Sequence, residues 1–198
     1  MRHAPVAVAV LVAVAVGIGV ALREHAASPP ELRAGTALPR PGSIADFSLT
    51  SQDGKPFRRK DLRGHWTLVF TGFTNCPDIC PATLATMADL ERRLARPDLE
   101  FRFVSVDPAR DTPEVIRRYL AHFGTGIAGA TGSREEVERF TSGLGLAQVV
   151  NPGAGGEYTV DHSTAIVLID RRARLAGYFQ APHRVDALAA DLATLPGP

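Results

Sequence analysis

The chain has 198 residues, of which 45% are hydrophobic and 22% charged, and its formal net charge is +1. This composition is typical of one globular domain with an appendage. The near-zero net charge gives no electrostatic basis for a nucleic-acid partner. Two cysteines are too few for the disulfide framework that stabilises small secreted domains.

The N-terminal segment differs from the rest because residues 4–22 carry no charge. As a helix this stretch would be roughly 28 Å long, close to the ~30 Å hydrocarbon core of a bilayer. Arg2 and the terminal amine precede it, whereas the charges of Arg23 and Glu24 cancel. By the positive-inside rule we expect residues 1–27 to anchor the chain in the inner membrane, with the N-terminus cytoplasmic and the domain periplasmic. A cleaved signal peptide is the alternative, and it would export the domain as well.

Residues 28–43 contain four prolines and few apolar side chains, which predicts a flexible tether. The folded domain is then expected over residues 44–196. Phe47 and Leu49 alternate with polar residues before Asp53-Gly54, a pair typical of a hairpin turn.

Strands and helices alternate after this turn. Residues 65–73 are apolar and rich in β-formers, residues 82–94 repeat apolar side chains at helical spacing, and residues 99–107 alternate as a strand does. A second helix begins after Thr112 and ends near Gly124, and a capping box of Ser133 and Glu136 begins a third.

The C-terminal part is expected to form a loop, a hairpin and a helix. The loop covers residues 151–156, the strands cover 163–170 and 175–179, and the helix covers 185–195. This order predicts an α/β thioredoxin-like sandwich, with a mixed, mainly parallel central sheet flanked by helices.

Both cysteines, Cys76 and Cys80, lie between the first long strand and its helix, and each precedes a proline. A residue before proline avoids the helical conformation, and Pro81 suits a first helical position. We therefore expect Cys80 at the N-cap and Cys76 in the loop, with both thiol pKa values lowered by the helix dipole.

Two neighbouring thiolates can form a disulfide, hold a metal or attack another disulfide. A structural zinc site needs about four protein ligands, so zinc would have to recruit two further groups. Cu(I) favours thiolates, and two cysteines with one histidine would suffice for it. Of the six histidines, His162 is the best candidate, because its strand is expected to start beside the end of the strand that leads to the cysteines.

Three stretches together resemble the Sco/SenC family of copper-binding proteins. They are GFTNCPDICPATL (72–84), SVDPARDTP (105–113) and VDHSTAIVLID (160–170), and they follow one another in the family's order. The resemblance covers roughly residues 40–195 and implies a thioredoxin-like, exported domain. Asn75 departs from the histidine that many members have there, at a position that is not a ligand.

The resemblance implies that Cys76, Cys80 and His162 bind one copper per chain, as Cu(I) or Cu(II). It also implies a metallochaperone, not an enzyme, whose recipient is the binuclear copper centre of cytochrome c oxidase. Other copper chaperones and thiol reductants are further partners in this interpretation. When oxidised, the two cysteines should form a disulfide that blocks copper binding.

Two alternatives remain open from the sequence. The chain could be a thiol–disulfide oxidoreductase that keeps the oxidase cysteines reduced, or a copper or redox sensor. Asp78 and Asp161 are candidates for orienting the imidazole or tuning the sulfurs from outside the ligand set. Asp107 and Asp111 are interpreted as turn or capping residues, with Arg110 available to neutralise either carboxylate.

Overall fold

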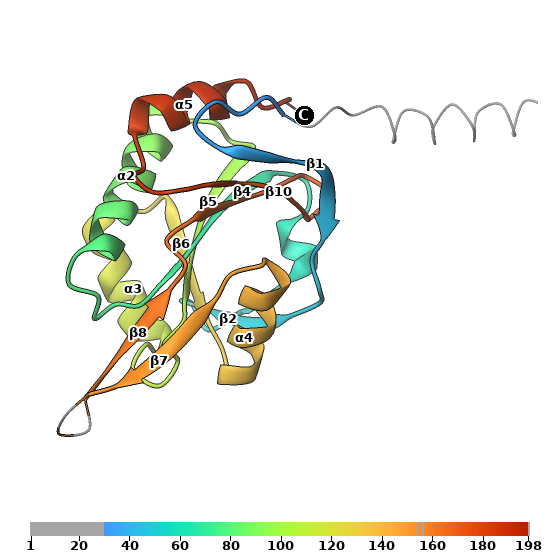
Figure 1. Cartoon of the computed structure of the whole chain (residues 1–198). Coiled ribbons are helices and arrows are strands. Elements are labelled where there is room, and N and C mark those ends of the chain that lie inside the picture. Colours follow the sequence, from blue (N-terminus) through green and yellow to red (C-terminus); the bar gives the residue numbers. More distant parts are fainter. Residues whose placement is uncertain (1–29, 154, 156, 198) are drawn as a thin grey trace, which may run out of the picture.

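A computed structural model describes residues 30–153, 155 and 157–197 of the chain (Figure 1). The expected membrane anchor at residues 1–27 lies outside these residues. Within the described part, no helix is both long and apolar enough to cross a bilayer. The strands are β1 (Thr36–Ser43), β2 (Ser48–Ser51), β3 (Pro56–Arg58), β4 (Trp66–Gly72), β5 (Leu99–Ser105), β6 (Ile127–Thr131), β7 (Gln148–Pro152), β8 (Tyr158–His162), β9 (Ile166–Ile169) and β10 (Arg174–Phe179). The helices are η1 (Arg59–Leu62), α2 (Ile79–Leu94), α3 (Pro113–Leu120), η2 (Ala121–Phe123), α4 (Arg134–Gly143) and α5 (Val185–Ala193).

Eight strands form one sheet in the order β1-β10-β9-β4-β5-β6-β2-β3. The mixed α/β sandwich with flanking helices is as predicted, but the expectation of a mainly parallel sheet is wrong. Among the described residues only the pairs β4–β5 and β5–β6 are parallel, and the remaining pairs are antiparallel. Two features produce the difference: β1 extends the sheet beyond the β9–β10 hairpin, and the β2–β3 hairpin pairs with β6.

Strand β1 corrects the predicted tether, because residues 36–43 pair with β10 and do not form a free linker. The chain just before β1 is also fixed, since the buried carboxylate of Asp191 accepts hydrogen bonds from the backbone N–H groups of Arg33 and Ala34 at 2.9 and 2.7 Å. The ordered domain therefore begins earlier than residue 44.

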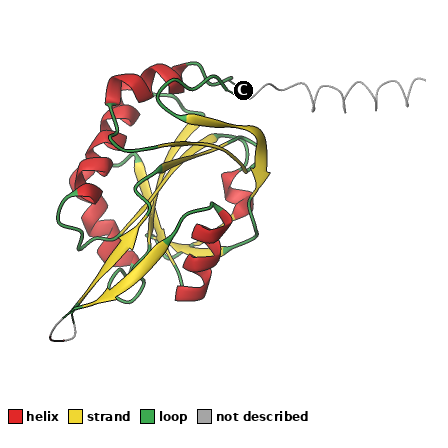
Figure 2. Ribbon diagram, viewed as in Figure 1, coloured by secondary structure: helices red, strands yellow, loops and turns green. Residues whose placement is uncertain are grey.

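Helices cover both faces of the sheet (Figure 2). On one face α2, α3 and α5 pack over apolar side chains that include Leu68, Phe70 and Phe103. On the other face α4 and η1 enclose Val69, Val104 and Val167. The β4 strand is buried along its whole length, so the loop that follows it starts from a rigid base.

The β7–β8 hairpin is a separate two-stranded sheet that projects from the body of the domain (Figure 1). The sequence predicted only a loop over part of it, residues 151–156, and began the next strand at 163. In the structure β8 ends at His162 and β9 begins at Ile166, so the histidine is the last residue of the hairpin, and residues 163–165 separate it from the core strand. The hairpin carries this side chain to the edge of the sheet where β4 ends.

Candidate metal centre

The two cysteines lie where the chain leaves β4 and enters α2. Cys76 is half-buried in the loop, and its N–H donates to the carbonyl of Phe73 at 3.3 Å. Cys80 was expected at the N-cap, but Asp78 takes that position and Cys80 lies inside the first helical turn. The helix can start early because the first N–H groups of a helix have no partner, so Pro81 costs no hydrogen bond.

His162 meets these thiols from the opposite side. Its Nε2 lies 3.4 Å from the Sγ of Cys80, and one donor atom from each of Cys76, Cys80 and His162 lies within 4.8 Å of the other two. No other group of three or more histidine, cysteine or acidic side chains in the described residues converges in this way. The sequence prediction that these three side chains meet is therefore matched by the geometry.

The carbonyl of Ser163 determines which nitrogen of His162 is free. The Nδ1 of His162 lies 2.9 Å from this carbonyl oxygen, which can only accept a hydrogen bond, so the proton is on Nδ1. The lone pair of Nε2 then points toward the sulfurs, with the Sγ of Cys80 at 3.4 Å. This is the tautomer and orientation that a metal-binding imidazole needs.

Burial sets the protonation state of the centre. It raises the pKa of the fully buried Cys80 thiol far above its ordinary value, and a hydrogen bond with Cys76 raises that pKa further. The expected lowering by the helix dipole is wrong for Cys80, because the loss of solvation outweighs the partial charge of the helix terminus. Burial also lowers the pKa of His162, so its imidazole stays neutral and available as a ligand.

The floor of the centre is closely packed. A Cβ atom at Gly72 would lie 2.8 Å from the Sγ of Cys80, so the thiol fits only over a glycine. The rings of Phe70 and Phe73 meet the His162 ring edge-to-face at centroid distances of 6.0 and 5.9 Å. This apolar floor accounts for the strong desolvation of Cys80 and His162.

In the described structure, neither candidate outer carboxylate forms a hydrogen bond with a donor atom of the centre. Asp78 is exposed and makes no capping hydrogen bond with its side chain. Asp161 is exposed and accepts a hydrogen bond from Asn151 Nδ2 at 2.7 Å across the hairpin. Their outer role stays a prediction, whereas the contact that orients the imidazole comes from Ser163.

Sequence reasoning missed the polar network behind the centre. Asp111 is not a simple turn residue: it is fully buried and accepts hydrogen bonds from the loop that leads to Cys76. Asp107 pairs with Arg110 and also accepts a hydrogen bond from Tyr158 in the hairpin. The signal was present in the SVDPARDTP stretch, but nothing local in that stretch identifies Thr74 or Tyr158 as partners.

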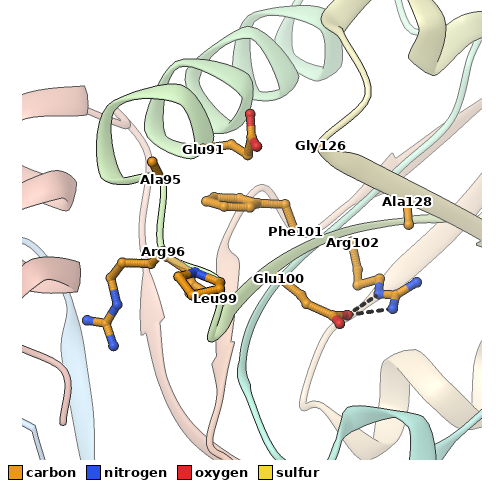
Figure 3. A pocket seen from close by; sticks show the side chains of 10 residues that line it. Glu91, Ala95, Arg96, Leu99, Glu100, Phe101, Arg102, Gly126 and Ala128 are labelled. Atoms are coloured by element: carbon orange, nitrogen blue, oxygen red, sulfur yellow. Dashed lines mark hydrogen bonds and ion pairs between the residues drawn. The ribbon is translucent and has the colours of Figure 1, made fainter. Parts of the chain in front are cut away.

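A pocket of about 550 Å³ opens beside His162, between the end of α4 and the start of β9. A second pocket, of about 520 Å³, lies at the beginning of β5, which is the far end of the sheet from the cysteine loop (Figure 3). In that second pocket Arg102 pairs with Glu100 at 2.5 Å and Arg96 pairs with Asp98 at 2.7 Å. Its arginines are paired with carboxylates and it lies at the opposite end of the sheet, so the pocket beside His162 is the one relevant to the metal centre.

Two thiolates and one imidazole form a soft donor set that suits copper. The sequence model of the SCO1/SenC family matches residues 37–196 of this chain. The chain belongs to the SCO1/SenC family.

Comparisons with individual proteins agree with this assignment. The chain is 38% identical over 154 residues to a putative copper-binding protein of Stutzerimonas stutzeri, which covers 76% of each chain. It is similar to the copper-bound structure of ScoI from Bradyrhizobium japonicum, with 34% identity, a TM-score of 0.71 and coverage of 76% of this chain and 98% of that one. It is also similar to BsSco, with 25% identity, a TM-score of 0.62 and coverage of 81% and 99%.

BsSco is described as a member of the Sco family of cytochrome c oxidase assembly proteins in which a disulfide switch was identified. Similarity to copper-bound family members and the converging thiols and imidazole together support one copper ion at this centre.

Proposed function

We propose that this chain is a membrane-tethered copper chaperone that holds one copper ion through Cys76, Cys80 and His162. The observation that carries the proposal is the convergence of their three donor atoms within 4.8 Å at a corner of the domain. Three protein ligands leave copper open to a further ligand from another protein, which closed four-ligand structural sites do not. The arrangement therefore suits delivery better than permanent storage.

The surroundings of the centre favour contact with a partner. Among the described residues, the exposed large apolar side chains are Ile79, Val149 and Val150. Ile79 is next to Cys80, and the two valines lie on β7, the strand paired with the one that ends at His162. Transfer by ligand exchange requires the recipient to approach the sulfurs closely, and apolar side chains at the rim would stabilise that complex.

The recipient in this proposal is the binuclear copper centre on the copper-site subunit of cytochrome c oxidase. Family membership supports this choice, since BsSco is described within a family of oxidase assembly proteins. The uncharged stretch at residues 4–22 supports an inner-membrane anchor with the domain on the periplasmic side. Other copper chaperones or thiol reductants would load and reduce the centre.

The delivery proposal is tested by mixing the copper(I)-loaded full chain with the copper-free, reduced copper-site subunit of the oxidase. Copper should move to the subunit, as measured by the metal content of the two proteins after chromatographic separation. Copper that stays on the chain would contradict delivery. The same assay with an oxidised subunit asks whether its disulfide is reduced instead.

Thiol–disulfide exchange is the second candidate function, because two thiols lie within 4.8 Å of each other. The attacking group in such exchange is a thiolate. The raised pKa of the Cys80 thiol keeps it protonated near neutral pH, which slows attack through this sulfur. Copper binding needs the same deprotonation, so the presence of the third donor, His162, and the similarity to a copper-bound family member rank copper delivery first. A sensor would use the same ligands.

Copper affinity should rise with pH. Copper binds the thiolate, so binding displaces the proton of Cys80, whose raised pKa keeps the thiol fully protonated between about pH 5 and pH 8. This proton alone should make the apparent affinity about tenfold tighter for each pH unit in that range. Because the pKa of His162 is lowered, protonation of its imidazole steepens the dependence of copper affinity on pH only at the acid end of this pH range. Competition titrations against a chelator of known pH dependence measure the slope, and a flat profile would contradict thiolate binding.

A further inference from the structure

We propose that residues 105–111, from the last residue of β5 into the β5–α3 loop, form a brace that positions both halves of the copper centre. One end of this brace holds the loop that carries Cys76, and the other end holds the hairpin that carries His162. The inference rests on the proposed copper site and assigns positioning roles to residues outside its ligand set.

The first arm of the brace runs from Asp111 to the cysteine loop. The carboxylate of Asp111 accepts hydrogen bonds from the N–H and Oγ1 of Thr74 at 2.9 and 2.6 Å, and from the Oγ of Ser105 at 2.6 Å. Thr74 is two residues before Cys76. Because Asp111 is fully buried, these hydrogen bonds are protected from water and hold the start of the loop in one place.

The second arm runs from Asp107 and Arg110 to the hairpin. Tyr158 donates its hydroxyl proton to Asp107 at 2.6 Å, and Arg110 Nη1 donates to the Tyr158 carbonyl at 3.2 Å. The guanidinium of Arg110 also lies 3.8 Å above the Tyr158 ring and pairs with Asp107. Tyr158 and His162 are the two ends of β8, an even number of residues apart, so they project from the same side of that strand.

The two arms are rigidly linked. The N–H groups of Arg110 and Asp111 donate to the carbonyl of Asp107 at 3.2 and 2.9 Å, which fixes the turn between the two carboxylates. The hairpin needs such a support, since its strands are not hydrogen-bonded to the large sheet. Burying two carboxylates costs solvation free energy, which the hydrogen bonds to Asp111 and Asp107 and the ion pair with Arg110 offset.

The Asp111 arm should act through Cys76, and the arm of Asp107 and Arg110 should act through His162. Measurements of copper affinity can distinguish the two arms. Tyr158→Phe removes the hydroxyl that reaches Asp107 and keeps the ring under Arg110. We expect this variant to weaken Cu(I) binding about tenfold, the lower end of the effect of groups that orient metal ligands. In the His162→Ala background the same change should have less than about a twofold effect, because the ligand that it positions is gone. Thr74→Val should weaken binding about tenfold in both backgrounds.

Asp107→Asn is a second variant of the hairpin arm, and Asp170→Asn is its matched control. Asp170 is also a buried carboxylate paired with an arginine, Arg174, but it follows β9 at the opposite end of the sheet. Asp107→Asn should weaken copper binding, whereas Asp170→Asn should lower thermal stability without changing copper affinity. Equal weakening by Tyr158→Phe in both backgrounds, or no weakening by either hairpin variant, would overturn the brace.

Amide hydrogen exchange of the metal-free full chain tests the brace without copper. Tyr158→Phe should speed exchange in the β7–β8 hairpin and leave β4 unchanged, and Asp170→Asn should not affect the hairpin selectively. Unchanged exchange in the hairpin would contradict the brace. If the wild type bound no copper, the proposed function would fail, but the exchange result would still decide whether this loop holds the hairpin.

Discussion

Cys76→Ala and Cys80→Ala should each weaken copper binding by about two to three orders of magnitude. Four-ligand zinc sites of thiolates and imidazoles bind their metal with about 10–16 kcal/mol, so one ligand contributes about 2.5–4 kcal/mol, and each 1.4 kcal/mol is tenfold. The loss should be of this size because only three donor side chains converge in the described structure. Competition with a cuprous chelator under anaerobic, reducing conditions measures the change.

The two variants should differ in the thermal stability of the metal-free chain, and this difference serves as the control. Cys76 is half-buried in a loop, so Cys76→Ala should change thermal stability little. Cys80 is fully buried against the core, so Cys80→Ala should also destabilise the chain by leaving a cavity. A Cys76→Ala variant that folds and binds copper like the wild type would contradict the ligand assignment.

Oxidation of the two cysteines should abolish copper binding. With glutathione disulfide as the oxidant, the two thiols lose two protons and two electrons, one S–S bond forms, and two molecules of reduced glutathione are released. The sulfurs lie within 4.8 Å, so bond formation at about 2.05 Å needs only a local rearrangement of the loop. His162 would then be the one donor left of the three, and a single imidazole cannot retain copper against a chelator.

Bound copper should in turn slow the oxidation of the two cysteines, since copper and the oxidant compete for the same thiolates. Loading with copper should protect both cysteines, as counted by thiol alkylation and mass measurement. An oxidised chain that still binds one copper would contradict the claim that the disulfide and the metal site use the same sulfurs. Rapid oxidation of the same thiols in the copper-loaded chain would contradict it as well.

The convergence of Cys76, Cys80 and His162 could be predicted because it depends on strand ends and on a motif. Cys76 and Cys80 follow a fully buried strand, and His162 precedes another strand of the same sheet, so both segments reach one edge. The exact helix start could not be predicted, because the rule for residues before proline is a preference that local packing overrides at Cys80. The protonation state was missed for a similar reason: burial by side chains such as Phe70 and Phe73 is a tertiary property.

Two strands were missed because their sequences lack the usual pattern. Strand β1 contains Pro39 and Pro41, which normally argue against a strand, but it lies at the edge of the sheet and its pairing with β10 shifts register between Ala37 and Gly42. Proline is tolerated in such a position because no neighbouring strand needs its missing N–H. The β7–β8 hairpin was missed because both strands are short and β7 is mostly exposed and does not alternate.

The brace behind the centre could not be predicted because its partners are distant in sequence. Asp111 and Thr74 are 37 residues apart, and Tyr158 and Asp107 are 51 apart. The sequence indicated an arginine able to neutralise Asp107, and the structure adds the tyrosine of the hairpin as the second partner.

The most direct test of the account is the copper stoichiometry of the purified full chain, reduced and loaded anaerobically. Wild type is compared with His162→Ala and with His183→Ala, a control histidine whose ring also contacts a backbone carbonyl, that of Thr164 at 2.9 Å. We predict one copper per chain for the wild type and His183→Ala, with copper lost or much weakened in His162→Ala. Equal binding by the wild type and His162→Ala would contradict the three-ligand site and leave thiol exchange as the main activity.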